Sequence, residues 1–211
     1  MLNSTLLIAA YAFIGSGMKY VDQVFDEGIF NKKFALVLTV VGSVLSAYLI
    51  LTDPYSATLI LSLIIGMSLV RKVDNPAFYL AASLIIAIPT ITLFVYTNGF
   101  ADGQVPIKWG PLGLLALSAV SDELMHDRAE AKIRRRKKLG PLDYVMYYRP
   151  VMKFSMVSLV YFLVFPFIYL IAFLAFDLCY TIVEKISLSG REGRNVKWLE
   201  KNYYNGHKGS G

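Results

Sequence analysis

Apolar runs that approach the length of a membrane-crossing helix recur along the whole chain. An α-helix needs roughly 20 apolar residues to cross a bilayer, and the runs here show no alternation with a period of two. Of the 211 residues, 56% are hydrophobic and only 17% are charged, whereas a soluble domain carries about a quarter charged residues. The sequence therefore predicts an all-α, polytopic integral membrane protein, and it argues against an outer-membrane barrel.

Glycine, proline and charged residues divide the apolar sequence into six predicted helices. We expect them at about residues 3–20, 34–52, 55–70, 77–97, 107–124 and 151–184. The last segment is long for one crossing and short for two, so Pro166 either kinks a single tilted helix or marks the tip of a helical hairpin. A single helix is the favoured interpretation. The transmembrane domain is then residues 1–190 with six helices, or seven if the hairpin forms, and residues 191–211 are a flexible basic tail.

Four glycines lie inside the predicted helices, where small residues let two backbones approach closely. They are Gly15, Gly17, Gly42 and Gly66. We expect each of them to serve helix packing.

Basic residues gather in alternate connections between the predicted helices. The first, third and fifth connections hold Lys32 and Lys33, Arg71 and Lys72, and the run KIRRRKK at 132–138. By the positive-inside rule these connections face the cytoplasm and the N-terminus lies outside. The chain is therefore expected to be a multi-pass cell-membrane protein. Its polybasic run is expected to contact anionic membrane lipids and no nucleic acid.

Two acidic clusters follow the first and fifth apolar runs, and the predicted orientation brings them to the same cytoplasmic face. Like charges one helical turn apart repel each other, and the negative end of the helix dipole disfavours them as well. Carboxylates at the C-terminal end of a helix, beside hydrocarbon, therefore indicate a bound cation. The clusters are KYVDQVFDEG, with Asp22 and Asp26, and SDELMHDRAE, with Asp122, Glu123, Asp127 and Glu130.

Magnesium is the cation that suits such clusters, because it binds through one or two carboxylates and shares its other positions with water and substrate phosphates. Two acidic helix ends that face each other could hold Mg²⁺ around a diphosphate, with nearby bases on the remaining phosphate oxygens. We expect Asp22, Asp26, Asp122 and Asp127 to hold the metal, Glu123 and Glu130 to support it, and Arg128 and Arg149 to bind phosphate.

Paired aspartate clusters on one membrane face resemble those of the UbiA-type membrane prenyltransferases. The matching positions are Asp22 and Asp26 for the first motif, and Asp122 and Asp127, with Glu123, for the second. The resemblance implies a membrane-embedded, Mg²⁺-dependent transferase that acts on an isoprenoid or other lipid diphosphate.

Three other interpretations of the same residues stay open. The acids could be ordinary interface charge that neighbouring lysine and arginine neutralise. They could form the entry of a cation channel or transporter in which Asp177, inside the last apolar run, lines the path. The chain could also be a non-catalytic scaffold that recruits partners through its basic segment.

Overall fold

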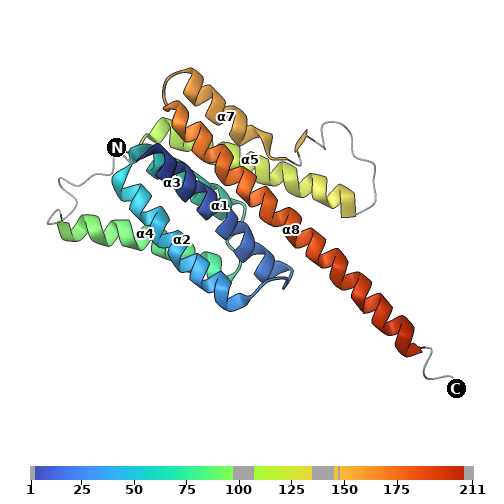
Figure 1. The fold of residues 1–211 in the computed structure, drawn as a ribbon. Coiled ribbons are helices and arrows are strands. Elements are labelled where there is room, and N and C mark those ends of the chain that lie inside the picture. Colours follow the sequence, from blue (N-terminus) through green and yellow to red (C-terminus); the bar gives the residue numbers. More distant parts are fainter. Residues whose placement is uncertain (1–2, 97–106, 135–144, 147, 207–211) are drawn as a thin grey trace.

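A computed structural model describes the backbone of residues 3–96, 107–134, 145–146 and 148–206 (Figure 1). Within these ranges, side chains are described except at residues 96, 130, 133–134, 188 and 190–206. The predicted all-α class is confirmed for this part of the chain, which forms seven α-helices and no β-strand. They are α1 (Ser4–Asp26), α2 (Lys32–Thr52), α3 (Pro54–Leu69), α4 (Pro76–Tyr96), α5 (Trp109–Arg134), α7 (Pro150–Tyr161) and α8 (Phe167–Gly206).

Short polar residues determine where the first three helices begin. The side chains of Asn3 and Asn31 accept hydrogen bonds from the backbone N–H groups of Thr5 and Lys33. Asp53 ends α2 and also begins α3, since its carboxylate accepts the N–H of Ser56 at 2.7 Å. These are the N-cap interactions that Asn and Asp provide.

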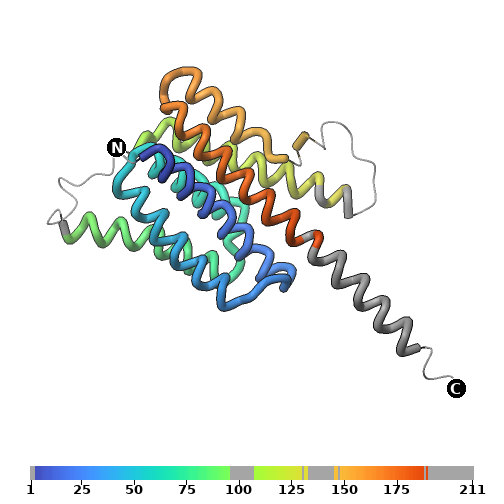
Figure 2. The backbone as a smooth tube through the Cα atoms, in the orientation of Figure 1, coloured from blue at the N-terminus to red at the C-terminus, as the bar shows by residue number. Residues whose placement is uncertain are grey.

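The segment 151–184 is a helical hairpin, so the single helix favoured from the sequence is wrong. Helix α7 ends at Tyr161, and Leu163 adopts a left-handed conformation with φ 56°. The N–H groups of Leu163 and Val164 bond back to the carbonyls of Val160 and Leu159 and close α7. Pro166 immediately precedes α8, where its missing N–H leaves no helix hydrogen bond unmade. Helix α8 then runs back beside α7 (Figure 2).

Helices α1 and α5 both extend beyond their predicted ends. Helix α1 continues to Asp26 and α5 continues to Arg134. Both acidic clusters therefore lie on regular helix, and each acid has a set direction around its helix axis.

Two of the four glycines that lie inside the predicted helices allow close contacts between helices. A Cβ at Gly15 of α1 would collide with the carbonyl oxygen of Phe176 on α8, and a Cβ at Gly66 of α3 would lie 2.6 Å from the Cβ of Ala119 on α5. The packing prediction is confirmed at these two positions. It is wrong at Gly42, where a Cβ would have no neighbour within 4 Å, and at Gly17, where the nearest atom would be 4.0 Å away.

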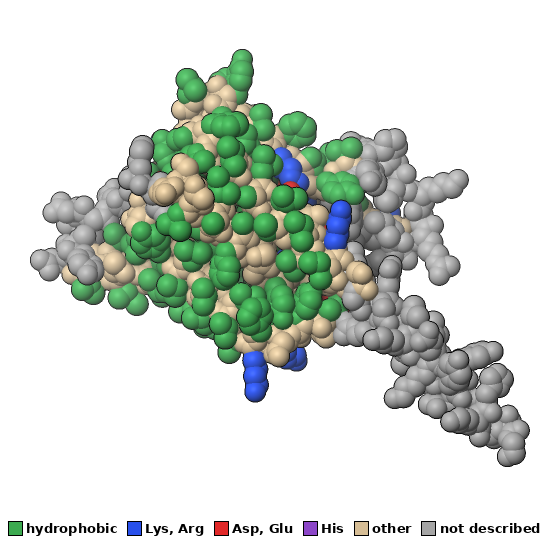
Figure 3. Space-filling model, in the orientation of Figure 1, with side chains coloured by type: hydrophobic (Ala, Val, Ile, Leu, Met, Phe, Trp, Pro, Cys, Tyr) green, Lys and Arg blue, Asp and Glu red, His purple; other side chains and the backbone are tan. Residues whose placement is uncertain are grey.

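Three helices in the described part of the chain are long and apolar enough to cross a membrane. They span Lys32–Thr52, Pro76–Val95 and Phe167–Ser187, and two shorter apolar helices cover Pro54–Leu69 and Pro150–Tyr161. Large apolar side chains cover the outside of the bundle, as Figure 3 shows for one face. Phe34, Val37, Val41 and Val44 of α2, for example, are all at least 48% exposed. Such a surface suits hydrocarbon better than water.

Candidate functional site

Two buried or half-buried cations converge on Tyr180 of α8. The Lys19 Nζ atom of α1 lies 4.9 Å from the ring centroid, and the Arg149 Cζ atom lies 5.3 Å from it. Both distances suit a cation–π interaction. Lys19 also forms ion pairs with Asp22 at 2.8 Å and with Glu184 of α8 at 3.4 Å. Tyr180 is thus the point where the charged groups of α1 meet those that surround Arg149.

Arg149 stands immediately before α7 and binds Glu123 of α5. Its Nη2 atom lies 3.2 Å from one carboxylate oxygen of Glu123 and 3.3 Å from the other. The Arg149 backbone has φ 49°, a left-handed conformation that is uncommon outside glycine. The Nε atom of Arg149 is buried and has no hydrogen-bond partner in the described structure.

Asp122 of α5 serves as the cap of α7. Its two carboxylate oxygens accept the backbone N–H groups of Val151 at 2.8 Å and Met152 at 2.7 Å. Arg149 occupies the N-cap position but makes no side-chain cap hydrogen bond. The Asp122 residue is only 3% exposed, and it satisfies N–H groups that would otherwise lack a partner at the start of α7.

Lys72, in the connection between α3 and α4, joins that connection to α5. Its Nζ atom lies 2.7 Å from Asp127 and 3.9 Å from Glu123. Partial burial acts to lower the pKa of Lys72, but the hydrogen bond and the charge of Asp127, with the charge of Glu123, outweigh this effect and raise the pKa. Lys72 therefore carries its charge at neutral pH.

Asp177 of α8 is neutralised by Lys153 of α7, whose Nζ atom lies 3.0 Å away. The sequence leaves Asp177 either as part of a pathway or as a group with a buried partner. The structure provides the partner, and the ion pair links the two helices of the hairpin.

A cavity of about 60 Å³ lies beside these ion pairs. One part of its wall is polar and the other part is apolar, with methionine and phenylalanine side chains from α1, α3, α7 and α8. The cavity can therefore receive a molecule that is polar at one end and apolar at the other. Its polar lining residues are Asp122, Glu123, Arg149, Asp177 and Tyr180, and its apolar ones include Met18, Met67, Met152, Phe173 and Phe176.

Of the predicted site residues whose side chains are described, three line this cavity and four do not. Asp122, Glu123 and Arg149 are brought together there. Asp127 pairs with Lys72 and Asp22 pairs with Lys19, while the side chains of Asp26 and Arg128 are exposed. The backbone of Glu130 lies in α5, but its side chain lies outside the description.

The predicted magnesium site stays a prediction, and the described carboxylates have protein partners. No group of three or more His, Cys, Asp and Glu side chains in the described residues could hold a metal ion. Asp22, Glu123 and Asp127 each have a lysine or arginine partner, and Asp122 has two backbone donors. Protein cations and N–H groups therefore offset part of the repulsion between these acids.

Tyr180 and Glu184 are the functional candidates that the sequence interpretation missed. They follow Asp177 by three and seven positions, the spacing of one helix face. That periodicity within an apolar run is the signal that could have identified the polar stripe of α8.

Comparison of the chain with protein-family models, with curated proteins and with solved structures found no match. Inference about function therefore starts from the site alone.

Proposed function

We propose that this chain is a multi-pass membrane protein that binds a lipid with a phosphate or diphosphate headgroup in the cavity beside Arg149. The observation that carries the proposal is Arg149, which lines a mostly apolar cavity and whose buried Nε atom is a donor without a partner in the described structure. A buried donor without an acceptor costs about 1–3 kcal/mol. A ligand oxygen at this position would remove that cost.

Arg149 is the group in the cavity wall that suits a phosphate. A guanidinium binds phosphate through several hydrogen bonds at once, and these are stronger because both partners are charged. Lys19 and Lys72 lie near the same ion pairs, and each is itself paired with carboxylates. The apolar wall, with Phe173 and Phe176 of α8, is suited to the first carbons of the lipid chain.

The same proposal includes the topology. Seven crossings in alternating directions, counting α1, α3, α5 and α7 with the three long apolar helices, place the connections at 27–31, 70–75 and 135–149 on one side. The basic residues of the sequence concentrate in and beside these connections, so we assign that side to the cytoplasm. The polar cavity then lies near the cytoplasmic boundary of the bilayer.

The Mg²⁺-dependent transferase that acts on an isoprenoid diphosphate is a narrower form of this proposal. Its metal would need carboxylates that are now paired, because Glu123 binds Arg149 and Asp177 binds Lys153. The support for it is that Asp122, Glu123, Asp177 and Arg149 line one cavity. Magnesium dependence is therefore a separate question that the binding assay addresses directly.

The test is binding of geranyl diphosphate to the purified protein in lipid nanodiscs, measured by calorimetry with Mg²⁺ and with a chelator. Geraniol, which has the same chain and no phosphate, is the ligand control. We expect the diphosphate to bind and geraniol not to bind measurably. The Arg149→Gln variant should lose binding, whereas Arg128→Gln, which removes the same charge from an exposed residue outside the cavity, should keep it.

Removal of Arg149 also leaves Glu123 without its partner, so folding needs its own control. The double variant Glu123→Gln/Arg149→Gln keeps the local charge balanced and should fold while it still fails to bind. Equal binding by Arg149→Gln and the wild type, or binding of geraniol as tight as that of the diphosphate, would overturn the proposal. A folded protein that binds neither ligand would favour the non-catalytic scaffold.

A further inference from the structure

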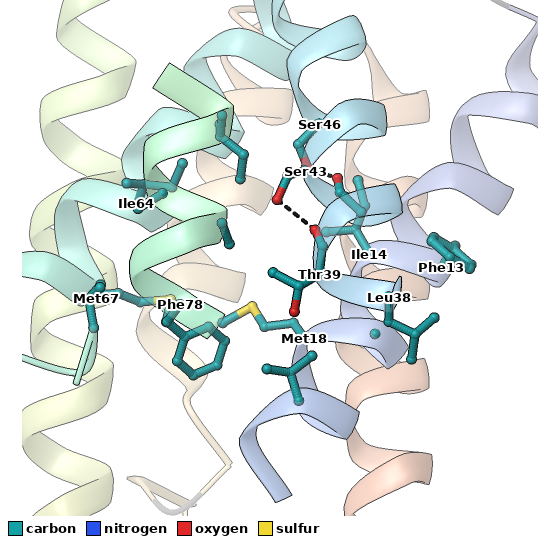
Figure 4. Close-up of a pocket in the computed structure, with 17 residues that line it drawn as sticks. Phe13, Ile14, Met18, Leu38, Thr39, Ser43, Ser46, Ile64, Met67 and Phe78 are labelled. Carbon is teal, nitrogen blue, oxygen red and sulfur yellow. Dashed lines mark hydrogen bonds between the residues drawn. The ribbon is translucent and has the colours of Figure 1, made fainter. Parts of the chain in front are cut away.

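A second cavity, of about 110 Å³, lies among α1, α2, α3 and α4, with residues such as Phe13, Leu38 and Ala82 in its wall (Figure 4). Among the described residues, its polar side chains are hydroxyls of α2, and these donate within their own helix. Ser43 donates to the carbonyl of Thr39 at 2.7 Å, and Thr39 donates to the carbonyl of Ala35 at 2.9 Å. The cavity thus offers a ligand an almost wholly apolar surface. We refer to it as the apolar cavity, and to the cavity beside Arg149 as the polar cavity.

Two methionines line both cavities. Met18 of α1 and Met67 of α3 belong to the wall of the polar cavity and to the wall of the apolar cavity. Figure 4 shows both side chains at the same end of the apolar cavity, next to Phe78. Methionine is unbranched and has three rotatable bonds, so it adapts to irregular contents more easily than other apolar residues. The partition between the cavities is therefore made of the most deformable apolar side chains.

We propose that the hydrocarbon chain of the bound lipid passes between Met18 and Met67 and ends in the apolar cavity, while its phosphate stays at Arg149. This inference rests on the proposed function and adds where the chain lies. The charged lining fixes the direction, because only the polar cavity offers an arginine to the headgroup. The apolar cavity is somewhat smaller than the roughly 150 Å³ apolar cavity that binds benzene, so it takes the terminal carbons of one chain.

Small residues line part of the apolar cavity. They are Gly17 of α1, Gly42 of α2, and Ala81 and Ala82 of α4. A Cβ at Gly42 would meet no atom within 4 Å, so a larger side chain there has room to extend into the cavity. The same small residues leave room for a flexible hydrocarbon chain.

The experiment compares butyl, octyl and dodecyl phosphate as ligands of the full chain in one detergent. In the wild type, affinity referred to the free aqueous concentration of each ligand should rise with chain length, by about fourfold for each methylene that enters the apolar cavity. Gly42→Leu fills this cavity and should remove most of the gain from octyl to dodecyl while butyl phosphate binds as before. Gly113→Leu is the matched control, since a Cβ there also meets no atom within 4 Å and the residue does not line either cavity.

A second filling variant, Ala82→Leu, approaches the cavity from α4 and protects the test against misfolding of Gly42→Leu. In both variants, the affinity is expected to change little between octyl and dodecyl phosphate. If butyl phosphate binds in an Arg149-dependent way but folded Gly42→Leu and Ala82→Leu keep the wild-type chain-length dependence, the inference is overturned and the proposed function survives. If no alkyl phosphate of any length binds through Arg149, the proposed function fails and the inference fails with it.

Discussion

The Asp122 carboxylate of α5 accepts the backbone N–H of Met152 at 2.7 Å and thereby holds the first turn of α7. This contact joins two helices through a group that the sequence marks as a metal ligand. It gives Asp122 a structural role that does not need a cation.

Asp122→Ala should destabilise the protein by about 1–2 kcal/mol, because the start of α7 loses a charge-assisted cap. Urea unfolding in detergent, followed by tryptophan fluorescence, measures the change. Asp127→Ala removes a carboxylate of the same helix whose pair with Lys72 is substantially exposed, at 44% and 37% of the two side chains, and it should cost less than about 1 kcal/mol. Equal losses in the two variants would argue against the capping role.

The Lys72 ion pair predicts a specific pH dependence of stability. The pKa of Lys72 is raised above its ordinary value of 10.5 in the folded chain, so the folded state binds its proton more tightly than the unfolded state does. The stabilisation is complete below pH 10.5 and is lost as the pH rises through the folded-state pKa. The difference in Tm between the wild type and Lys72→Gln should therefore stay level from neutral pH to about pH 10 and shrink above it.

Lys33→Gln serves as the control for this measurement, because it removes the same charge from an exposed side chain at the start of α2. A Tm difference for Lys72→Gln that grows with alkaline pH would have the wrong sign and would contradict the assignment.

Gly15→Ala should destabilise the contact between α1 and α8. The new Cβ would collide with the backbone carbonyl of Phe176, which cannot move without a shift of α8, and overpacking of this kind costs about 1–3 kcal/mol. Gly17→Ala, two residues further along the same helix, should be tolerated, since its Cβ would lie 4.0 Å from the nearest atom. Thermal unfolding of both variants checks the prediction, and similar Tm values would refute it.

The pair of Glu123 and Arg149 should show strong coupling in a double-mutant cycle. Arg149→Gln leaves Glu123 only the longer contact with Lys72, and Glu123→Gln removes the carboxylate that Arg149 binds, whereas the double variant removes both charges. We expect a coupling energy on the order of 1 kcal/mol or more from chemical unfolding. Additive effects of the two single variants would show that the contact contributes little.

Apolar run length, breaker residues and charge distribution are local properties, and they were sufficient to predict the helical class and most helix positions of this chain. Asp53 and Pro54 end α2 and begin α3 where expected, because capping and the missing N–H of proline act within a few residues. The break at Pro166 was visible in the sequence as well. Its outcome as a hairpin depended on whether α7 could pack against its neighbours, which no local signal reports.

The grouping of charged side chains was decided by the tertiary structure alone. The sequence predicted Asp122, Glu123 and Arg149 as site residues, and it left open which groups would lie beside each of them. The fold brings Arg149 to Glu123, Lys72 to Asp127 and two backbone N–H groups to Asp122. Ion pairs between distant residues depend on helix rotation and helix packing, which the spacing along the chain does not contain.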